Sequence, residues 1–86
     1  MIGPFEDRAP TSAELTDYDR AHMKLYMRLL DAAADGADWR EAVQVLFGID
    51  PAREEERARL VHDSHLDRAR WMTHTGFRHL LRQSRN

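Results

Sequence analysis

The sequence contains no cysteine, and only four of its 86 residues are glycine. Without cysteine there is neither a disulfide framework nor a thiolate zinc site, so side-chain packing alone must hold the fold together. With so few glycines there is little irregular loop to shape a pocket, and no nucleophile elbow, phosphate-binding glycine loop or paired-carboxylate cleft is recognisable. The sequence therefore predicts a protein that is not an enzyme and has no small-molecule substrate.

Long apolar runs are also missing. No segment approaches the roughly 18 consecutive apolar residues that span a bilayer. The N-terminal stretch MIGPFEDRAP lacks the basic and then apolar order of a signal peptide. We therefore expect a soluble, cytoplasmic protein with no membrane partner.

The five histidines raise the possibility of a metal site. His62 and His65 are three residues apart in a segment expected to be helical, as two ligands could be. His65, however, falls on the apolar stripe of that helix, and no acidic or thiolate third ligand is convincingly placed. We expect structural or solvent-exposed histidines, with no metal and no other cofactor.

The net charge is −2 at pH 7, which argues against indiscriminate nucleic-acid binding, because neutralisation of phosphates supplies most of that affinity. The charge is unevenly distributed. Residues 1–50 carry ten acidic and five basic side chains, whereas residues 51–86 carry five acidic and eight basic ones. The C-terminal part is therefore the part suited to an anionic partner.

The N-terminal residues contain two prolines, one glycine and no periodic apolar pattern. Residues 1–15 are therefore expected to form a flexible arm that is either extended or mobile. Ile2 and Phe5 are the side chains of this arm that could dock on the rest of the protein. Residues 16–86 are expected to form one helix-turn-helix-like domain.

Capping residues and apolar periodicity predict two helices in the first half of this domain. Thr16 and Asp19 have the spacing of a capping box, at the start of a helix that runs to about residue 34. Asp38 begins a second, short helix in the same way, over residues 38–47. Gly48 then follows, where a residue in the left-handed conformation would end the helix.

The second half of the domain predicts one long helix and one short helix. The long helix begins either at Asp50 or near Glu54 and runs to about residue 73. Its core stripe consists of Ala58, Val61, His65, Ala69 and Met72. The last short helix has Phe77, Leu80 and Leu81 on its apolar face and Arg78, Arg82 and Arg85 on its outer side. The predicted fold class is all-α, with four helices and the N-terminal arm.

The stretch WREAVQVLFGID, followed by a helix, is typical of a helix-turn-helix motif. Ala42 allows the helices to cross closely, Gly48 permits the turn, and Ile49 fills the space between the helices. Helix bundles without nucleic-acid function show the same features, so the motif alone leaves the function open. In such a motif the start of the second helix meets the bases, but here residues 54–56 are glutamates, whose carboxylates repel phosphates.

A family resemblance narrows the choice. The stretch LTDYDRAHMKLYMRLLDAAADGADWREAVQVLFGIDP and the later SHLDRARWMTHTGFRHLLR resemble the bacterial domain-of-unknown-function family 2285, over about residues 14–82. The resemblance implies a helix-turn-helix variant of proteobacterial transcription regulators, including regulators of integrative and conjugative element transfer. Small stand-alone members of this kind are antiactivators. They bind a LuxR-type quorum-sensing regulator and an excision activator that contains related domains.

Three functional hypotheses follow. The first is an antiactivator that represses conjugative-element transfer by contact with such transcriptional activators, and direct DNA binding is not expected of it. Its partner-binding surface is expected on the exposed side of the third helix, at Arg53, Glu54, Glu55, Arg57, Leu60 and Arg68. The alternative is a DNA-binding helix-turn-helix transcription regulator that uses Arg53, Arg57, Arg59 and the C-terminal arginines. A third reading, a small structural partner or toxin-antidote-like module, has no sequence feature of its own.

Overall fold

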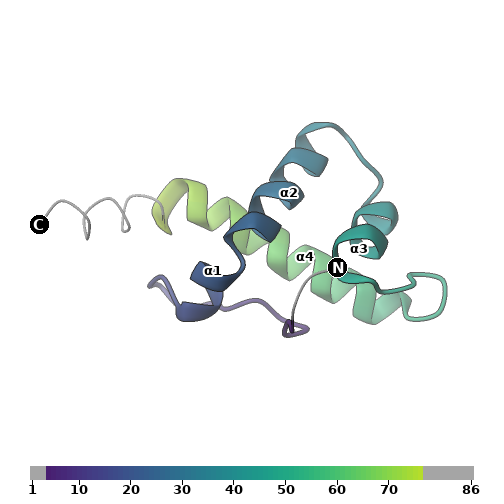
Figure 1. The fold of residues 1–86 in the computed structure, drawn as a ribbon, viewed down its shortest axis with the longest axis horizontal. Helices are drawn as coiled ribbons and strands as arrows, with labels where there is room; N and C mark the ends of the chain where they lie inside the picture. Colours follow the sequence, from purple (N-terminus) through teal and green to yellow (C-terminus); the bar gives the residue numbers. More distant parts are fainter. Residues whose placement is uncertain (1–3, 77–86) are drawn as a thin grey trace, which may run out of the picture.

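The computed structural model describes residues 4–76, and all regular secondary structure within this range is helical. The elements are α1 (Asp17–Ala21), α2 (Met23–Ala34), α3 (Trp39–Phe47) and α4 (Glu55–Trp71), followed by the π-helical turn η1 (Met72–Gly76) (Figure 1). The all-α class is thus confirmed, and the described residues contain four α-helices. The short helix predicted around Phe77, Leu80 and Leu81 lies outside the described residues. None of the described helices is long and apolar enough to cross a membrane.

The long first helix expected from the sequence is instead two helices that meet at His22. The predicted capping box starts α1: Thr16 Oγ1 accepts from the Asp19 backbone N–H at 3.2 Å, and the Asp19 carboxylate accepts from the Thr16 N–H at 2.9 Å. His22 leaves the helical conformation, with φ −116° and ψ 22°. Its ring stacks on the Tyr18 ring, with the two ring centroids 4.0 Å apart, and its Nδ1 lies 2.7 Å from the Tyr18 carbonyl oxygen. The single helix was wrong because the backbone leaves the helical conformation at His22, whose N–H donates to the carbonyl oxygens of both Tyr18 and Asp19 as at the end of a helix.

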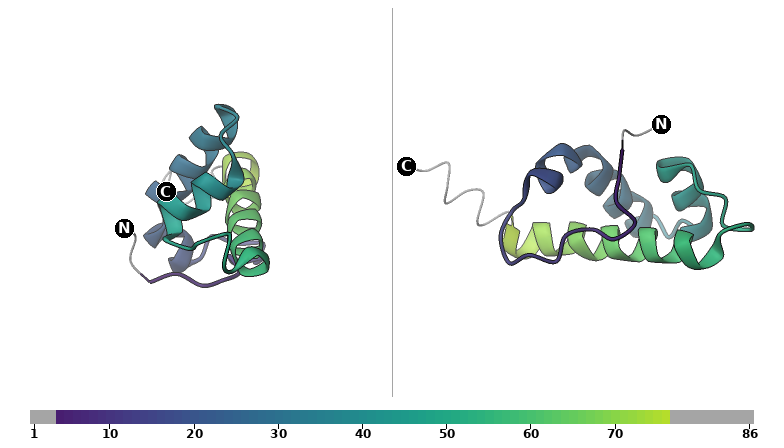
Figure 2. Two further views of the ribbon diagram at one scale, coloured as in Figure 1. Left: turned by 90° about the vertical axis from the view of Figure 1, so that its right-hand side faces the viewer. Right: turned by 90° about the horizontal axis from the view of Figure 1, so that it is seen from below.

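The core lies between α4 and the helices that pack on one side of it. Figure 2 shows α1, α2 and α3 gathered on this side of α4. The stripe predicted for the long helix is confirmed, since Ala58, Val61, His65, Ala69 and Met72 are all buried. The facing apolar side chains are Leu25 and Leu29 of α2, Val43, Leu46 and Phe47 of α3, and Ile49 of the following turn.

The N-terminal segment, residues 4–15, runs in an extended conformation along α4 (Figure 2). The Phe5 ring packs edge-on against Phe47, with ring centroids 5.1 Å apart. The Ala9 backbone N–H donates to Ser64 Oγ on α4 at 3.1 Å, and Leu15 is buried. The expected extended arm is therefore seen here docked on the domain. Phe5 makes the contact proposed for it, and Ile2 lies outside the described residues.

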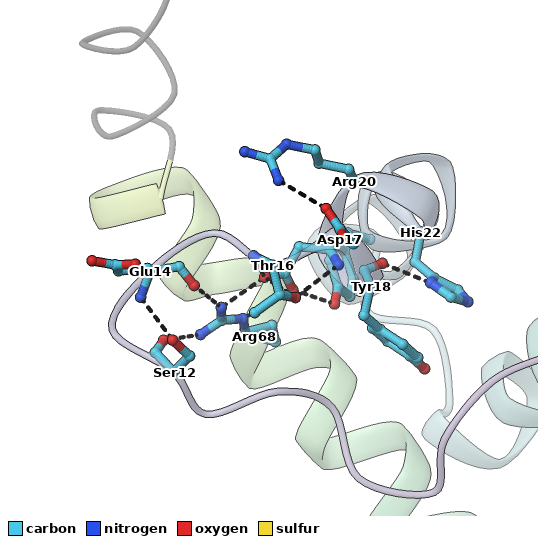
Figure 3. A network of polar contacts seen from close by, with 10 residues as sticks. Ser12, Glu14, Thr16, Asp17, Tyr18, Arg20, His22 and Arg68 are labelled. Atoms are coloured by element: carbon cyan, nitrogen blue, oxygen red, sulfur yellow. Dashed lines mark hydrogen bonds and ion pairs between the residues drawn. The ribbon is translucent and has the colours of Figure 1, made fainter.

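A buried ion pair between Asp19 of α1 and Arg68 of α4 ties this segment down. Arg68 Nε donates to Asp19 Oδ1 at 3.0 Å, and Arg68 Nη2 donates to Oδ2 at 2.7 Å. The same guanidinium donates to the carbonyl oxygens of Ser12 and Glu14 at 2.6 and 2.9 Å (Figure 3). Asp19 has no exposed surface and Arg68 is 4% exposed. One guanidinium thus joins α1, α4 and the N-terminal segment.

Further groups hold the two charges in place. The Asp19 carboxylate also accepts from the Thr16 hydroxyl and, at 2.8 Å, from the Tyr26 hydroxyl. The Trp71 ring covers the Arg68 guanidinium, with its centroid 3.8 Å from the guanidinium carbon. Burial alone would raise the pKa of Asp19, but the hydrogen bonds from Arg68, Thr16 and Tyr26 outweigh it and lower the pKa to about 2. Burial and the bond to Asp19 raise the pKa of Tyr26, so its hydroxyl remains a donor.

His65 is a second polar group of the core, and it is fully buried. Its Nδ1–H donates to the Val61 carbonyl oxygen at 2.7 Å, and its Nε2 accepts from the Tyr18 hydroxyl at 2.6 Å. Burial lowers the pKa of His65, so the neutral ring is favoured. Within residues 4–76, no three His, Asp or Glu side chains are grouped so that they could hold a metal ion.

Arg68→Met leaves the Asp19 carboxylate buried without its main partner. We therefore expect a loss of about 3–5 kcal/mol in the free energy of unfolding. Arg70→Met, on the exposed side of the same helix, is the matched control and should change stability by about 0.5 kcal/mol or less. Urea unfolding followed by circular dichroism measures both variants. Equally small losses would show that the ion pair does not hold the fold.

The lowered pKa of His65 predicts a loss of stability in mild acid. The unfolded chain binds this proton more readily, so the contribution of neutral His65 is complete above the ordinary pKa of 6.5 and is lost as the pH falls through the lower folded pKa. His65→Gln is less stable at neutral pH but has no such proton to gain. Thermal melts between about pH 7.5 and pH 5 should show the two melting temperatures converging as the pH falls. Parallel curves would contradict this assignment.

Candidate nucleic-acid interface

The helix-turn-helix-like unit predicted from the sequence consists of α3, the turn after it and α4. The Asp38 carboxylate caps α3 by accepting from the backbone N–H of Arg40 at 3.0 Å. Gly48 ends α3 in the left-handed conformation, with φ +71°. Ile49 is only 3% exposed and fills the space between α3 and α4. The roles predicted for the glycine and the aliphatic residue are confirmed.

A separate turn from Asp50 to Glu54 leads into α4. The Asp50 carboxylate accepts from the Ala52 N–H at 2.9 Å, and its carbonyl accepts from the N–H groups of Arg53 and Glu54. Of the two starts that the sequence allowed, the later one is correct, because α4 begins at Glu55. The three glutamates therefore lie at the N-cap and in the first turn of α4, where the positive end of the helix dipole favours carboxylates.

One face of α4 is turned away from the core and toward solvent. This open face consists of Glu56, Arg59, Leu60, Asp63, Asp67 and Arg70. The N-terminal segment covers the flank beside it, where it contacts Arg57 and Arg68. A groove runs over the open face between Arg8 of that segment and Trp39 and Arg40 at the start of α3. In a helix-turn-helix protein, the outward face of the second helix is the one that enters the major groove.

Two arginines at the rim of this groove stack on one indole ring. The guanidinium carbons of Arg40 and Arg59 lie 4.8 and 4.7 Å from the centroid of the Trp39 ring. Arg59 Nε also donates to Asp63 at 2.9 Å, and Arg40 lies 3.8 Å from Glu55. Both arginine side chains remain 55% exposed. Stacking orients the guanidinium groups while leaving donors available for a phosphate or a base edge.

Asp63 contributes a carboxylate to the centre of the open face. His62 Nδ1 lies 2.9 Å from its Oδ1, on the side opposite the bond from Arg59. Partial burial alone would raise the pKa of Asp63, but the hydrogen bonds from His62 and Arg59 outweigh it and lower the pKa. The group is therefore ionised at neutral pH. An ionised carboxylate in a major groove can accept a hydrogen bond from a cytosine amino group.

The arginines near the open face differ in how far they are already neutralised. Arg57 pairs with Asp7 at 3.0 Å and with Glu54 at 3.3 Å. By contrast, Arg8, Arg53 and Arg70 are exposed and form no ion pair within residues 4–76. These three are the guanidinium groups that can meet an anionic partner without first breaking a contact.

The structure does not bring the six residues predicted as a partner-binding surface onto one face. They are Arg53, Glu54, Glu55, Arg57, Leu60 and Arg68. Glu55 contacts the α3 side of α4 through Arg40, whereas Arg57 contacts the N-terminal segment on the opposite flank. Leu60 is half-buried on the open face between them, and Arg53 and Glu54 lie in the preceding turn.

The expectation that Arg68 is exposed was wrong. Its guanidinium is buried because it neutralises Asp19, which lies 49 residues earlier in the chain, and no local pattern shows such a pairing. Sequence reasoning also missed Arg8, Trp39 and Arg40 as parts of one surface. The adjacent Trp and Arg of the stretch WRE were the only sequence signal for Trp39 and Arg40, and Arg8 had none. The sequence does not show how α3 and the N-terminal segment lie relative to α4.

The sequence matches one known protein family over nearly its whole length. Residues 3–82 match the family RovC_DNA-bd, which is described as "T6SS, Transcription factor, DNA binding domain". The chain belongs to this family. No curated protein matches the chain. The resemblance to family 2285 agrees with this result only in its coarser part, a helix-turn-helix-like regulator family.

The match corrects the functional hypothesis drawn from the sequence. The RovC_DNA-bd family is described by DNA binding and transcription, not by inhibition of activator proteins and not by a catalytic activity. The antiactivator hypothesis, and with it the expectation that direct DNA binding does not occur, was therefore wrong, and the alternative is favoured. The hypothesis failed in part because it treated the carboxylates of Glu54 and Glu55 as unpaired charges. In the structure they lie beside Arg57 and Arg40.

Gly48→Ala tests the geometry of the turn between α3 and α4. A methyl group at this position would meet no atom within 4 Å, so any loss comes from the positive φ alone. We expect a loss of about 1–2 kcal/mol in the free energy of unfolding, the cost of a left-handed residue that has a Cβ. Gly48→Asn is the matched variant and should lose less, because asparagine tolerates this conformation. Equal stability of all three proteins in urea would exclude a strained turn.

Proposed function

We propose that this chain binds DNA as the helix-turn-helix-like domain of a transcription regulator, with α4 as the helix that enters the major groove. The observation that carries the proposal is the family match, which spans nearly the whole chain and whose description is DNA binding. The geometry supports it, because α3 and α4 are joined by a glycine turn and the open face of α4 is free of the core. Such a role also suits the cytoplasmic location expected from the sequence.

The charge of each side chain determines the role proposed for it in the interface. The open face carries both arginines and carboxylates, which can distinguish base edges by donating and accepting hydrogen bonds. Arg59 and Arg70 are its donors, and Asp63 is an acceptor held by His62. Arg8 and Arg53 flank the face and are suited to phosphates, which position a protein on the duplex without reading its sequence.

The acidic surroundings make this binding selective. Carboxylates on and beside the open face repel the duplex wherever no cytosine amino group or arginine compensates them. Non-specific affinity should therefore be low for a DNA-binding domain, since that affinity comes almost entirely from phosphate neutralisation. Arginines 78, 82 and 85 add positive charge at the C-terminal end without any acidic neighbour in residues 77–86.

Replacing open-face arginines should weaken DNA binding and leave the fold intact. Duplexes selected from a random library serve as probes, and fluorescence anisotropy measures the dissociation constant. Arg59→Ala and Arg70→Ala should each weaken binding roughly 5- to 150-fold, the value of one good base contact. Arg53→Ala should weaken binding to all sequences alike and reduce the magnitude of the salt slope by about 1.

Arg28→Ala on α2 is the control, because Arg28 is also exposed but lies on a helix packed on the other side of α4. It should bind like the wild type. If no duplex is bound even at low salt, the proposed function is excluded. If binding occurs but Arg59→Ala and Arg70→Ala leave it unchanged, the function stands and the open face is not the interface.

A further inference from the structure

An apolar groove lies between α2 and the end of α4, on the opposite side of α4 from the open face. Its walls are Met23, Met27 and Leu30 from α2 and Ala69 and Met72 from α4 and η1. Thr73 and the ring of Tyr26 complete the lining, and no charged side chain contributes to it. The groove is therefore unsuited to DNA and suited to an apolar partner.

The groove is not filled by any part of residues 4–76. Met27 is 63% exposed, and Met23 and Leu30 are only half-buried, although these last two pack against the core. A contiguous apolar surface of this kind is kept in contact with water only at a free-energy cost, and a segment that covered it would remove that cost. The question is what covers it.

The chain itself supplies a matching segment at the edge of the groove. Residues 77–86 follow directly on η1, and Thr73 of η1 already lines the groove. Phe77, Leu80 and Leu81 have the spacing i, i+3, i+4 that places side chains on one face of a helix. The family match extends to residue 82, so it includes all three of these residues as part of the domain.

We propose that the apolar groove receives Phe77, Leu80 and Leu81 of the same chain. Only three residues lie between Thr73 and Phe77, so their Cα atoms are at most roughly 14 Å apart even when the chain is fully extended, and the segment begins within reach of the groove. This short connection gives the segment an effective concentration on the order of millimolar, which favours it over the same segment of a second molecule.

Docking of these side chains has a consequence for the basic residues between them. If the segment is helical, its basic side chains fall on a different face from its apolar ones and stay on the outer side when it docks. These basic residues are Arg78, Arg82 and Arg85. Docking therefore fixes them to the domain as a basic surface. Their use in phosphate contacts rests on the proposed DNA binding, whereas the docking itself does not.

Disulfide trapping tests the docking directly, because the full chain has no cysteine of its own. Met27→Cys is combined in turn with Phe77→Cys, Leu80→Cys and Leu81→Cys. Each double variant is oxidised at micromolar concentration and separated without reductant. At least one pair should form an intramolecular disulfide in high yield, because docking holds three candidate positions beside Met27 and the bond needs only one pair of Cα atoms to approach to roughly 4.4–6.8 Å. Val45→Cys, 70% exposed on α3, replaces Met27→Cys in the matched controls and should give no such product.

Each outcome decides the proposal without reference to DNA. A monomeric cross-link with Met27→Cys, absent with Val45→Cys, supports docking within the chain. A cross-linked dimer that disappears on dilution would assign the groove to a second copy and overturn the proposal. No cross-link in any of the three Met27→Cys pairs, or equal yields with Val45→Cys, would also overturn it. DNA binding by the uncrosslinked protein would remain a separate measurement.

Discussion

The arrangement of the domain depends on the buried ion pair between Asp19 and Arg68. Taking two charges out of water is costly, and this cost is met only because every polar atom involved has a partner. Within residues 4–76 no buried side-chain nitrogen or oxygen is left without a hydrogen bond. Since the Arg68 guanidinium also holds the carbonyls of Ser12 and Glu14, the pair sets the path of the N-terminal segment along α4. That path in turn determines which part of α4 faces solvent.

The arginines of α4 are therefore divided between structure and binding. Arg68 is buried in its ion pair with Asp19, and Arg57 pairs with Asp7. Arg59 and Arg70 are left on the open face, where α3 supplies Trp39 and Arg40 at the rim. A domain with a net negative charge can bind DNA in this way, because recognition needs a few oriented donors and not a uniformly basic surface. Under the proposed function, the same acidity weakens binding to DNA sequences whose base edges do not match the open face.

Local patterns predicted the helices of the fold well, but they did not predict which charged side chains are buried. The burial of Val61 and His65 and the turn at Gly48 follow from spacing and backbone conformation, which are written in neighbouring residues. The break at His22 is a local change of backbone conformation, and helical periodicity does not show it. The burial of Arg68 depends on a partner in another element. Three glutamates in succession argued against DNA binding, but two of them, Glu54 and Glu55, lie beside Arg57 and Arg40, and the chain belongs to a family described by DNA binding.

The central claim is that DNA is bound by the open face of α4. Nuclear magnetic resonance tests it most directly, with a ¹⁵N-labelled full-length chain titrated with a duplex that it binds. The amide signals that shift or broaden should belong to α4 around Arg59, Asp63 and Arg70 and to the turn at Gly48, while α2 around Met27 stays unchanged. Changes confined to α2, with the signals of α4 unaffected at saturation, would contradict the account.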